Sequence, residues 1–227
     1  NAMCFFDPQM QSVLAERVAL EKELRIALQQ QHFVLHYQPQ VNEAGAMVGV
    51  EALVRWQHPE RGMVSPLDFI ALAEDTGLIL PLGHWVLETA CTQLAAWAQR
   101  ADRLLLTMAV NVSVRQFHHA DFVEQVLRVL QATGANPQRL KLELTESLLI
   151  TQVDEVVAKM SALKARGVCF SLDDFGTGYS SLAYLKRLPL DQLKIDKSFV
   201  SHVLTDTNDA AIAGMIVALS ESLGLEV

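Results

Sequence analysis

Cysteine, basic charge and long apolar runs are all scarce in this chain of 227 residues, and each scarcity excludes a class of protein. The three cysteines, Cys4, Cys91 and Cys169, form no Cys-x-x-Cys pair, so the sequence predicts neither a disulfide framework nor a thiolate zinc site and indicates a reducing cytoplasm. The chain has 18 basic and 26 acidic residues and a formal net charge of −8, which argues against binding to a nucleic-acid polymer. Its longest apolar stretch, residues 210–219, is far shorter than the roughly 20 residues of a membrane span. We therefore expect no direct membrane contact from this segment, although upstream parts of a parent protein could carry an anchor.

The chain does contain enough apolar material for one large core, with 51% hydrophobic residues. Asn1 and Ala2 stand before Met3 and look like a tag remnant, so they are left out of fold reasoning. Residues 9–31 carry apolar positions at helical spacing without Gly or Pro, which predicts an amphipathic helix over the connector segment 3–31. One main domain is expected over residues 32–227.

Within that domain, the pattern predicts a hairpin followed by alternating helices and strands. Residues 33–41 and 47–56 are predicted as paired strands, because a turn at 42–45 separates them and Pro39 suits an edge strand. Helices are predicted over 65–74, 82–100, 121–132, 152–166 and 208–223, with a short helix from residue 180. Later strands are predicted from the apolar runs that begin at Leu104, Leu140, Val168 and Leu190. They end at positions 111, 143, 173 and 194, which are 32, 30 and 21 residues apart and leave room for one crossover helix each. This order predicts an α/β barrel.

Oxygen-bearing side chains stand at the carboxyl ends of the predicted strands. They are Glu51, Asn111, Glu143, Asp173 and Asp174. In a barrel of parallel strands these ends share one mouth, where the chemistry is done. Such ligands suit Mg²⁺ or Mn²⁺, and adjacent aspartates can diverge to serve two cations, as in two-metal phosphoesterases. The pattern therefore predicts a two-metal site, although an Asp-Asp pair by itself would also suit a helix cap.

Three other residues near the predicted mouth have two interpretations each. Lys194 lies on an apolar strand with Asp196 facing the same way, so it either orients a water molecule or is a salt-bridged structural lysine. Arg55 either binds a phosphate or forms a surface ion pair. Glu146 either holds the glycine-containing loop at 174–182 or caps the helix that follows it. That loop suits a lid over the ligand and a plain strand-to-helix turn about equally.

Several ordered motifs resemble those of EAL domains, the cyclic-di-GMP phosphodiesterases. The motifs are Glu51-Ala52-Leu53-Val54-Arg55-Trp56, Asn111-Val112-Ser113, Glu143-Leu144-Thr145-Glu146-Ser147, residues 173–182, and Lys194-Ile195-Asp196-Lys197-Ser198-Phe199. The resemblance covers residues 33–227 and implies a TIM-like (β/α) barrel of EAL type with an antiparallel first strand. Residues 5–8 and the helix after them resemble the junction that follows a GGDEF domain, so upstream GGDEF and sensory domains are expected in a longer parent protein.

The resemblance also implies an activity, the hydrolysis of cyclic di-GMP to linear pGpG with two Mg²⁺ or Mn²⁺ ions. The ligands it implies are Glu51, Asn111, Glu143 and Asp173 for the first ion, and Asp173, Asp174 and Asp196 for the second. It implies a catalytic role for Lys194, acting on the attacking water, and for Glu51. Substrate contacts are implied for Arg55, Gln38 and Leu53, and anchoring of the 174–182 loop for Glu146. A homodimer through the helices that flank this loop is a further expectation.

The chain departs from the family pattern at its last residues. In the family, the next strand carries a Glu-Gly-Val-Glu segment whose glutamate acts as general base, whereas the sequence here stops at Glu226 and Val227. The pattern contains six strands and a fragment, and a closed barrel of this kind has eight. We therefore expect a C-terminally truncated barrel and an inactive or impaired fragment of an active parent. The alternatives are a non-catalytic cyclic-di-GMP receptor and an enolase-like lyase, of which the second suits the carboxylates but not the full motif set.

Overall fold

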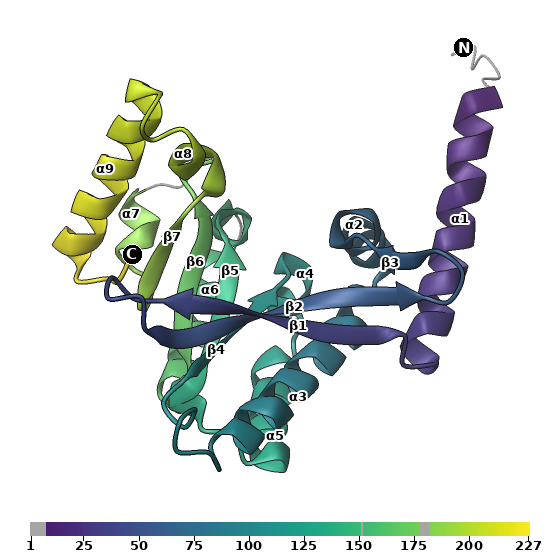
Figure 1. Ribbon diagram of the computed structural model, residues 1–227, viewed down its shortest axis with the longest axis horizontal. Coiled ribbons are helices and arrows are strands. Elements are labelled where there is room, and N and C mark those ends of the chain that lie inside the picture. The colour runs from purple at the N-terminus through teal and green to yellow at the C-terminus, as the bar shows by residue number, and fades with distance from the viewer. Residues whose placement is uncertain (1–7, 151, 178–181) are drawn as a thin grey trace.

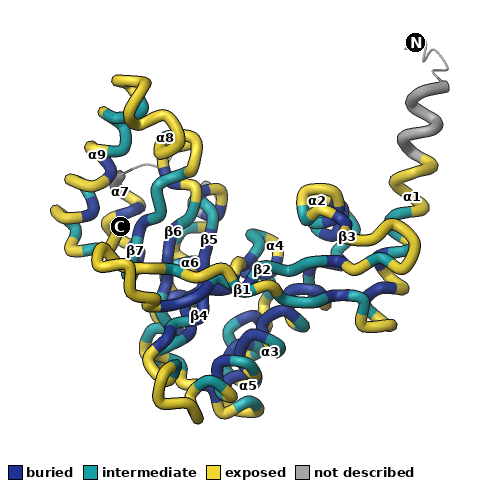
Figure 2. The backbone as a smooth tube through the Cα atoms, viewed as in Figure 1, coloured by how far each residue is buried: buried dark blue, intermediate teal, exposed yellow. Residues whose placement is uncertain are grey.

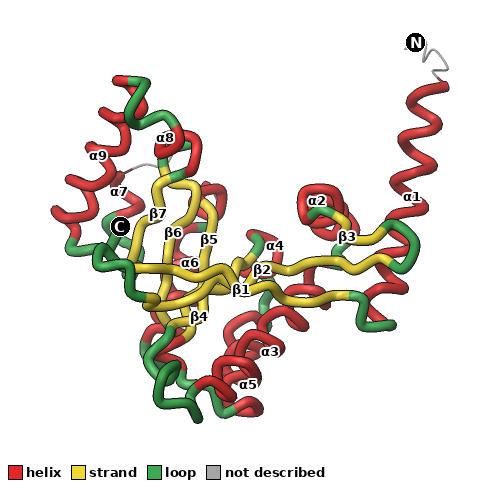
Figure 3. Tube along the Cα trace, in the orientation of Figure 1, coloured by secondary structure: helices red, strands yellow, loops and turns green. Residues whose placement is uncertain are grey.

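The computed structural model describes residues 8–150, 152–177 and 182–227, and it arranges them as a mixed sheet with helices packed against it (Figures 1 and 3). Within these ranges the strands are β1 (Phe33–Val41), β2 (Met47–His58), β3 (Gly62–Val64), β4 (Thr107–Val112), β5 (Leu140–Thr145), β6 (Cys169–Phe175) and β7 (Gln192–Ile195). The helices are α1 (Pro8–Gln29), α2 (Pro66–Thr76), α3 (Ile79–Trp97), α4 (Val114–His118), α5 (Phe122–Thr133), α6 (Val153–Lys164), α7 (Leu182–Leu185), α8 (Lys197–Ser201) and α9 (Thr207–Leu223). Two 3₁₀ turns cover Pro137–Arg139 and Glu146–Ile150.

Strands β1 and β2 form the predicted antiparallel hairpin, which runs across the molecule in Figure 1. In its turn, the Asn42 side chain accepts hydrogen bonds from the amides of Ala44 and Ala46 at 3.1 and 2.9 Å. Gly45 has a φ of 74°, a left-handed conformation that glycine adopts without steric cost. The resulting register places Gln38 directly opposite Glu51. The local turn chemistry thus decides which β1 side chain lies beside the first strand-end carboxylate.

The remainder of the sheet is parallel, in the order β2, β4, β5, β6 and β7. Helices lie in the crossovers between these strands, as the strand spacing predicted. Strands β4 to β6 consist largely of buried residues and appear dark blue in Figure 2. Strands buried in this way expose mainly their ends. Every carboxyl end of the parallel strands therefore meets at one edge of the sheet.

The described residues form two hydrophobic cores. The larger core lies between the sheet and helices α3, α5 and α6. The second core lies at the other end of the hairpin, where Leu24 of α1 packs with Phe33, Trp56 and Phe69. Leu24 is fully buried, so the helix predicted as a connector also contributes core residues.

Some element boundaries differ from the sequence predictions. Strand β4 begins at Thr107, because Leu104 and Leu105 lie in a turn with 46% and 64% of their surface exposed. Helix α3 begins at Ile79 rather than at residue 82, because Gly77, with a φ of 79°, ends α2 just before it. Strand β3 and helix α4 were not predicted, since elements of three and five residues are too short to show periodicity.

The sheet formed by the described strands is open. Its outermost strands are β1 and β7, and an isolated parallel bridge between Gln192 and Glu226 lies beside β7. This agrees with the predicted open barrel. None of the described helices combines the length and apolar character needed to cross a membrane.

Candidate metal and substrate site

Side chains from five neighbouring strands converge toward the carboxyl ends of the parallel strands. Glu51 comes from β2, Asn111 from β4, Glu143 from β5, Asp173 from β6 and Lys194 from β7. The parallel register places Asn111 beside Glu143, whereas Asp173 lies beside the residue two positions further along β5. The register thus brings these residues to one edge of the sheet.

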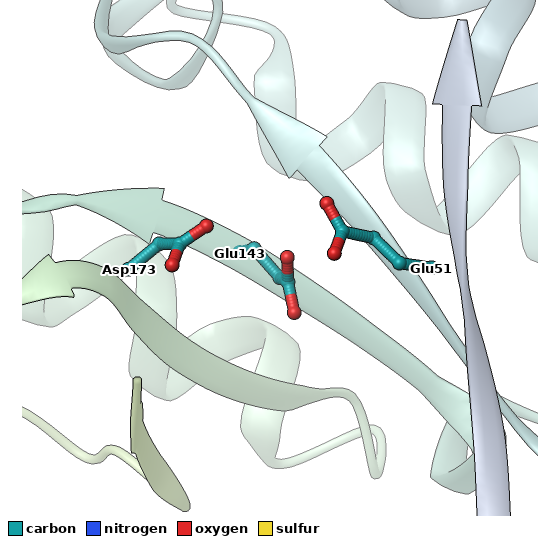
Figure 4. Close-up of side chains that lie close together, drawn as sticks. All are labelled: Glu51, Glu143 and Asp173. Atoms are coloured by element: carbon teal, nitrogen blue, oxygen red, sulfur yellow. The ribbon is translucent and has the colours of Figure 1, made fainter. Parts of the chain in front are cut away.

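Three of these residues, Glu51, Glu143 and Asp173, form an acidic cluster, which Figure 4 shows with the carboxylates turned toward one another. One carboxylate oxygen from each lies within 4.8 Å of the others. Asn111 lies at the edge of the cluster, where its Nδ2 donates to Glu51 Oε1 at 2.7 Å. Carboxylates this close repel one another unless a cation is among them.

Lys194 supplies a positive charge to the acidic cluster. Its Nζ lies 2.7 Å from Glu143 Oε2, 2.9 Å from Asp173 Oδ2 and 3.5 Å from Glu51 Oε2. Burial alone would lower the pKa of Lys194, but the Glu143 and Asp173 carboxylates outweigh it and raise this pKa above its ordinary value. The side chain is therefore an ammonium ion that donates hydrogen bonds to Glu143 and Asp173 and is ion-paired with Glu51.

Glu143 is the most deeply buried member of the cluster, with no exposed side-chain surface. Burial raises the pKa of its carboxyl to about 7, with further upward contributions from Glu51 and Asp173 that Lys194 partly offsets. Its Oε2 accepts from Lys194, but its Oε1 accepts no hydrogen bond from any described residue. Buried carboxylate oxygens nearly always have a partner, so this atom is a candidate cation ligand.

The two adjacent aspartates diverge, as the sequence analysis expected of a pair serving two cations. The β6–β7 register shifts between Leu172 and Phe175, and Asp174 takes a left-handed φ of 54°. Asp174 thereby faces Asp196. Asp196 is the N-terminal cap of α8, and its Oδ1 accepts a hydrogen bond from the Ser198 amide at 2.8 Å.

The two facing carboxylates have shifted pKa values. Partial burial raises the pKa of Asp174, and the Asp173 and Asp196 carboxylates raise it further. Hydrogen bonds from Ser198 lower the pKa of Asp196. Asp174 and Asp196 therefore form a second pair of carboxylates beside the acidic cluster.

Glu146 contacts the loop that follows β6. The amide of Gly176 donates to Glu146 Oε2 at 3.4 Å, and Glu146 is 7% exposed. Of its two predicted interpretations, the contact with the loop agrees with this geometry. Residues 178–181 of the loop lie outside the described residues, so the prediction of a lid extends beyond what the structure describes.

A cavity of ≈ 540 Å³ opens beside the acidic cluster, between β2 and helices α2, α3 and α4. Asn111, Glu143 and Asp174 line its cluster end, and Leu53 and Arg55 line its β2 wall. The Arg55 Nη1 donates to the carbonyl oxygen of Val54 at 2.8 Å, which directs the guanidinium along this wall rather than into a surface ion pair. Gln38 does not line this cavity but lies opposite Glu51 in the hairpin, on the same face of the sheet. The structure thus brings the predicted substrate contacts and the predicted ligands to neighbouring positions.

The donor set of the cluster fits a hard divalent cation. Every candidate ligand is an oxygen atom, a type that Mg²⁺ and Mn²⁺ prefer to imidazole or thiolate. The free Oε1 of Glu143 is a buried acceptor that such an ion would satisfy. The observed residues therefore fit the ions that the motifs predict.

The profile described as EAL domain matches residues 21–227, most of the chain. The chain belongs to the EAL domain family. Its β1–β2 hairpin followed by parallel strands is accordingly the TIM-like barrel arrangement that the motifs predicted, with the sheet left open in the described residues.

The chain is similar to known EAL proteins in both sequence and structure. The protein MucR of Pseudomonas aeruginosa, named a bifunctional diguanylate cyclase/cyclic di-GMP phosphodiesterase, is 46% identical over 230 residues, which cover 100% of this chain and 33% of MucR. The cyclic di-GMP phosphodiesterase PdeR of Escherichia coli is 39% identical over 224 residues, which cover 99% of this chain and 34% of PdeR. A solved structure of the MucR phosphodiesterase in a c-di-GMP complex superposes with a TM-score of 0.88 at 47% identity, covering 91% of this chain and 84% of that one. The chain thus spans about a third of the length of these curated relatives.

Sequence reasoning missed the far wall of the cavity in this EAL domain. Ile70 of α2 and the buried Gln116 of α4 line that wall. A Cβ added to Gly83 of α3 would lie 2.3 Å from Gln116 Oε1, so this glycine makes room for the amide. The available signal was a glycine inside a helical pattern, which usually marks close packing. That signal does not reveal which side chain packs there.

Proposed function

We propose that this EAL domain hydrolyses cyclic di-GMP to linear pGpG with two Mg²⁺ or Mn²⁺ ions. The observation that carries the proposal is the acidic cluster, whose three carboxylates lie within 4.8 Å at the end of a cavity lined by Arg55. Relatives at 39–46% identity are named cyclic di-GMP phosphodiesterases, which supports the substrate. Phosphodiesterases of this family need divalent metal ions, which supports the cofactor.

The residues proposed to hold the ions fall into two overlapping groups. Glu51, Asn111, Glu143 and Asp173 would hold the first ion, and Asp173, Asp174 and Asp196 the second. When bound, the ions would acidify a water molecule and neutralise charge on the phosphoryl group. Two ions are proposed because Asp174 and Asp196 form a second carboxylate pair that the acidic cluster does not use.

Other side chains would bind and position the reactants. Lys194 would donate an N–H to the attacking water. Glu51 would hold the Lys194 ammonium in place. The guanidinium of Arg55 would bind a substrate phosphate, and Leu53 and Gln38 would contact the nucleotide. Hydrolysis adds the water oxygen to one phosphorus and breaks one of its ester P–O bonds. Glu146 would keep the loop after β6 against the site.

The remaining catalytic group is the general base. Glu226 does not supply it, because its Oε2 lies 3.8 Å from Nζ of Lys141, near the start of β5 and away from the carboxyl ends of the strands. We propose that the base is a glutamate on a strand after Val227, as the family resemblance implies. We therefore propose that these 227 residues alone turn over cyclic di-GMP more slowly than a chain that continues through that strand.

The remaining expectations concern the longer protein. We propose that residues 3–31 connect this domain to an upstream GGDEF domain and sensory domains, which the name of MucR as a bifunctional cyclase and phosphodiesterase supports. A homodimer through the helices flanking the loop after β6 is also a proposal, as is a cytoplasmic location.

The test is conversion of cyclic di-GMP to pGpG, followed by chromatography with Mg²⁺, Mn²⁺ or EDTA, for this chain and for one that continues past Val227. Turnover is expected with either ion, faster in the longer chain, and none in EDTA. Glu143→Gln should remove turnover in both chains, because it replaces an ion ligand with an amide of the same shape. Glu124→Gln is the matched control, since Glu124 is an exposed residue of α5 paired with Arg128.

Binding distinguishes the enzyme from a receptor. Calorimetry with cyclic di-GMP and Ca²⁺ should detect binding by the wild type. Binding by both chains without turnover in either would favour the receptor, and the absence of both binding and turnover would contradict the proposed substrate. Equal rates for the two chains would contradict the assignment of the base to the later strand.

A further inference from the structure

The ammonium group of Lys194 lies in the space that the acidic cluster encloses. Its Nζ contacts Glu143 Oε2, Asp173 Oδ2 and Glu51 Oε2 at 2.7, 2.9 and 3.5 Å. These are the same three residues whose oxygens lie within 4.8 Å of one another and could share an ion. One side-chain cation therefore already contacts the ligand set proposed for a divalent one.

A divalent ion and the ammonium would compete for these carboxylates. An ion that took the oxygens Lys194 contacts would displace the ammonium from them, and an ion bound through the free Glu143 Oε1 would still lie beside it, because the ligand atoms of the three residues lie within 4.8 Å of one another. Positive charges that close repel strongly in a poorly solvated site. Loading therefore requires the ammonium to move away from at least part of the cluster.

The position of Lys194 permits that movement. Its side chain is 24% exposed, whereas Glu143 beneath it is fully buried. A lysine side chain is a flexible four-carbon stem ending in a compact charge. Lys194 also lines a second cavity, together with Gln40 and Lys141. The ammonium can thus move toward that cavity while the carboxylates stay in place.

We propose that Lys194 is a tethered counter-cation of the acidic cluster, which neutralises the carboxylates before an ion binds and competes with the ion for them. This inference rests on the proposed metal-dependent function. It gives Lys194 a second position, in addition to the one in which it would act on the water molecule. In the first position the lysine keeps the carboxylates together, and in the second it is released to act on water.

The experiment measures Mn²⁺ affinity by electron paramagnetic resonance of the free ion, with no substrate present. Lys194→Met removes the charge and keeps an unbranched chain, so the variant should bind Mn²⁺ about tenfold more tightly than the wild type. Lys22→Met removes the same charge from an exposed position on α1 and should leave the affinity unchanged. Equal or weaker binding by Lys194→Met would overturn the inference, because a lysine that only organises the ligands would give that result.

Thermal unfolding tests whether the variants are folded. In EDTA, Lys194→Met should unfold at a lower temperature than the wild type, since three carboxylates lose their cation, and Mn²⁺ should restore more of the midpoint than it adds to the wild type. If Lys194→Met does not fold, Lys194→Gln, which keeps hydrogen-bonding capacity without charge, must show the tighter binding instead. Mn²⁺ binding by neither wild type nor variant would overturn the proposed function and this inference together, whereas binding without a gain in the variants would overturn the inference alone.

Discussion

At the scale of single residues, the site depends most on how deeply each carboxylate is buried. Glu143 and Asp173 stand at neighbouring strand ends, but only Glu143 has no exposed side-chain surface, and its pKa rises to about 7. An oxygen held in that environment without a hydrogen-bond donor gains most from a cation. The burial of Glu143 by β5 and its neighbours therefore makes it the member of the acidic cluster most sensitive to substitution.

Ser171 is a second buried group near the site, and it has a different expected response. It is fully buried beside Glu143 in the β5–β6 register, and its Oγ has no hydrogen-bond partner among the described residues. A buried hydroxyl without a partner has a desolvation cost that a methyl group lacks. We expect Ser171→Ala to leave the free energy of unfolding unchanged or to raise it by up to about 1 kcal/mol, as measured by urea denaturation. A loss greater than about 1 kcal/mol would show that the hydroxyl makes a hydrogen bond in solution.

The sequence indicated which side chains lie together better than it indicated their electrostatics. Positions at the ends of apolar runs were enough to nominate Glu51, Asn111 and Glu143, because a strand buried on both faces tolerates charge only at its end. For Glu51 the run ends but the strand does not, since β2 continues to His58. The raised pKa of Glu143 depends on which groups surround it in space. The divergence of Asp174 depends on its left-handed φ, which alternation along a strand does not indicate.

At the scale of secondary-structure elements, helix α2 links the second core to the cavity. Phe69 and Ala73 on one face of α2 pack in the core that contains Leu24 of α1. Ile70 and Glu74, each the next residue along α2, line the cavity, and Ile70 also packs against that core. Helix α1 is further tied to α2 by an ion pair between Arg17 and Asp75. The position of α1 therefore affects a wall of the proposed substrate site.

Leu24→Ala tests this link. Truncating the fully buried Leu24 side chain should lower the free energy of unfolding by about 2–5 kcal/mol, measured by urea denaturation. Because α2 would shift toward the space left by the leucine, the affinity for cyclic di-GMP with Ca²⁺ should also fall. The matched control is Leu163→Ala on α6, which is equally buried but lies in the larger core and does not line the cavity. A similar loss of affinity in both variants would argue against a specific effect through α2.

Helix α6 supplies a cap for α4 and a pH-dependent ion pair. Nζ of Lys159 donates to the carbonyl oxygens of Phe117, His118 and His119 at 3.0–3.1 Å and lies 2.7 Å from Glu155 Oε1. The Lys159 hydrogen bond lowers the pKa of Glu155. A carboxyl group with a lowered folded-state pKa adds stability above its unfolded pKa and loses it as the pH falls through the folded pKa. The melting temperature of the wild type should therefore exceed that of Glu155→Gln at about pH 7, and this difference should disappear at about pH 3. A difference in melting temperature that persists at the lower pH would contradict the ion pair as its cause.

Long elements were predicted well from sequence, and short ones were not. The bounds of β1 agree with the prediction at both ends, because an apolar alternation, a proline and a turn coincide there. The apolar run that begins at Leu104 was misleading, since its first residues are exposed leucines of a turn. Apolar content alone does not distinguish a buried strand from an exposed turn, and the distinction comes from packing against α3 and α5.

At the scale of the whole molecule, the two cores are joined rather than separate. Val54 of β2 and Trp85 of α3 pack against both of them. Strand β2 carries Glu51 in its first half and Trp56, fully buried in the second core, near its end. A rigid strand and a shared helix connect the metal site to the far end of the molecule, so we expect both cores to unfold in one transition.

Mn²⁺ provides the test of that cooperativity, because the ion would bind at one core and Trp56 reports on the other. In a variant with Trp85→Phe and Trp97→Phe, Trp56 is the one tryptophan left of three. Mn²⁺ at about 100 times its dissociation constant should stabilise the folded state by about 2.7 kcal/mol, which corresponds to about 5–10 °C for a chain of this size. If the cores unfold together, the Trp56 fluorescence midpoint should rise by the same amount as the circular-dichroism midpoint. A circular-dichroism transition that moves while the Trp56 signal stays fixed would show that the second core, with α1 and α2, unfolds independently of the metal site. In that case a signal arriving through α1 would have to reach the cavity by displacing α2 directly.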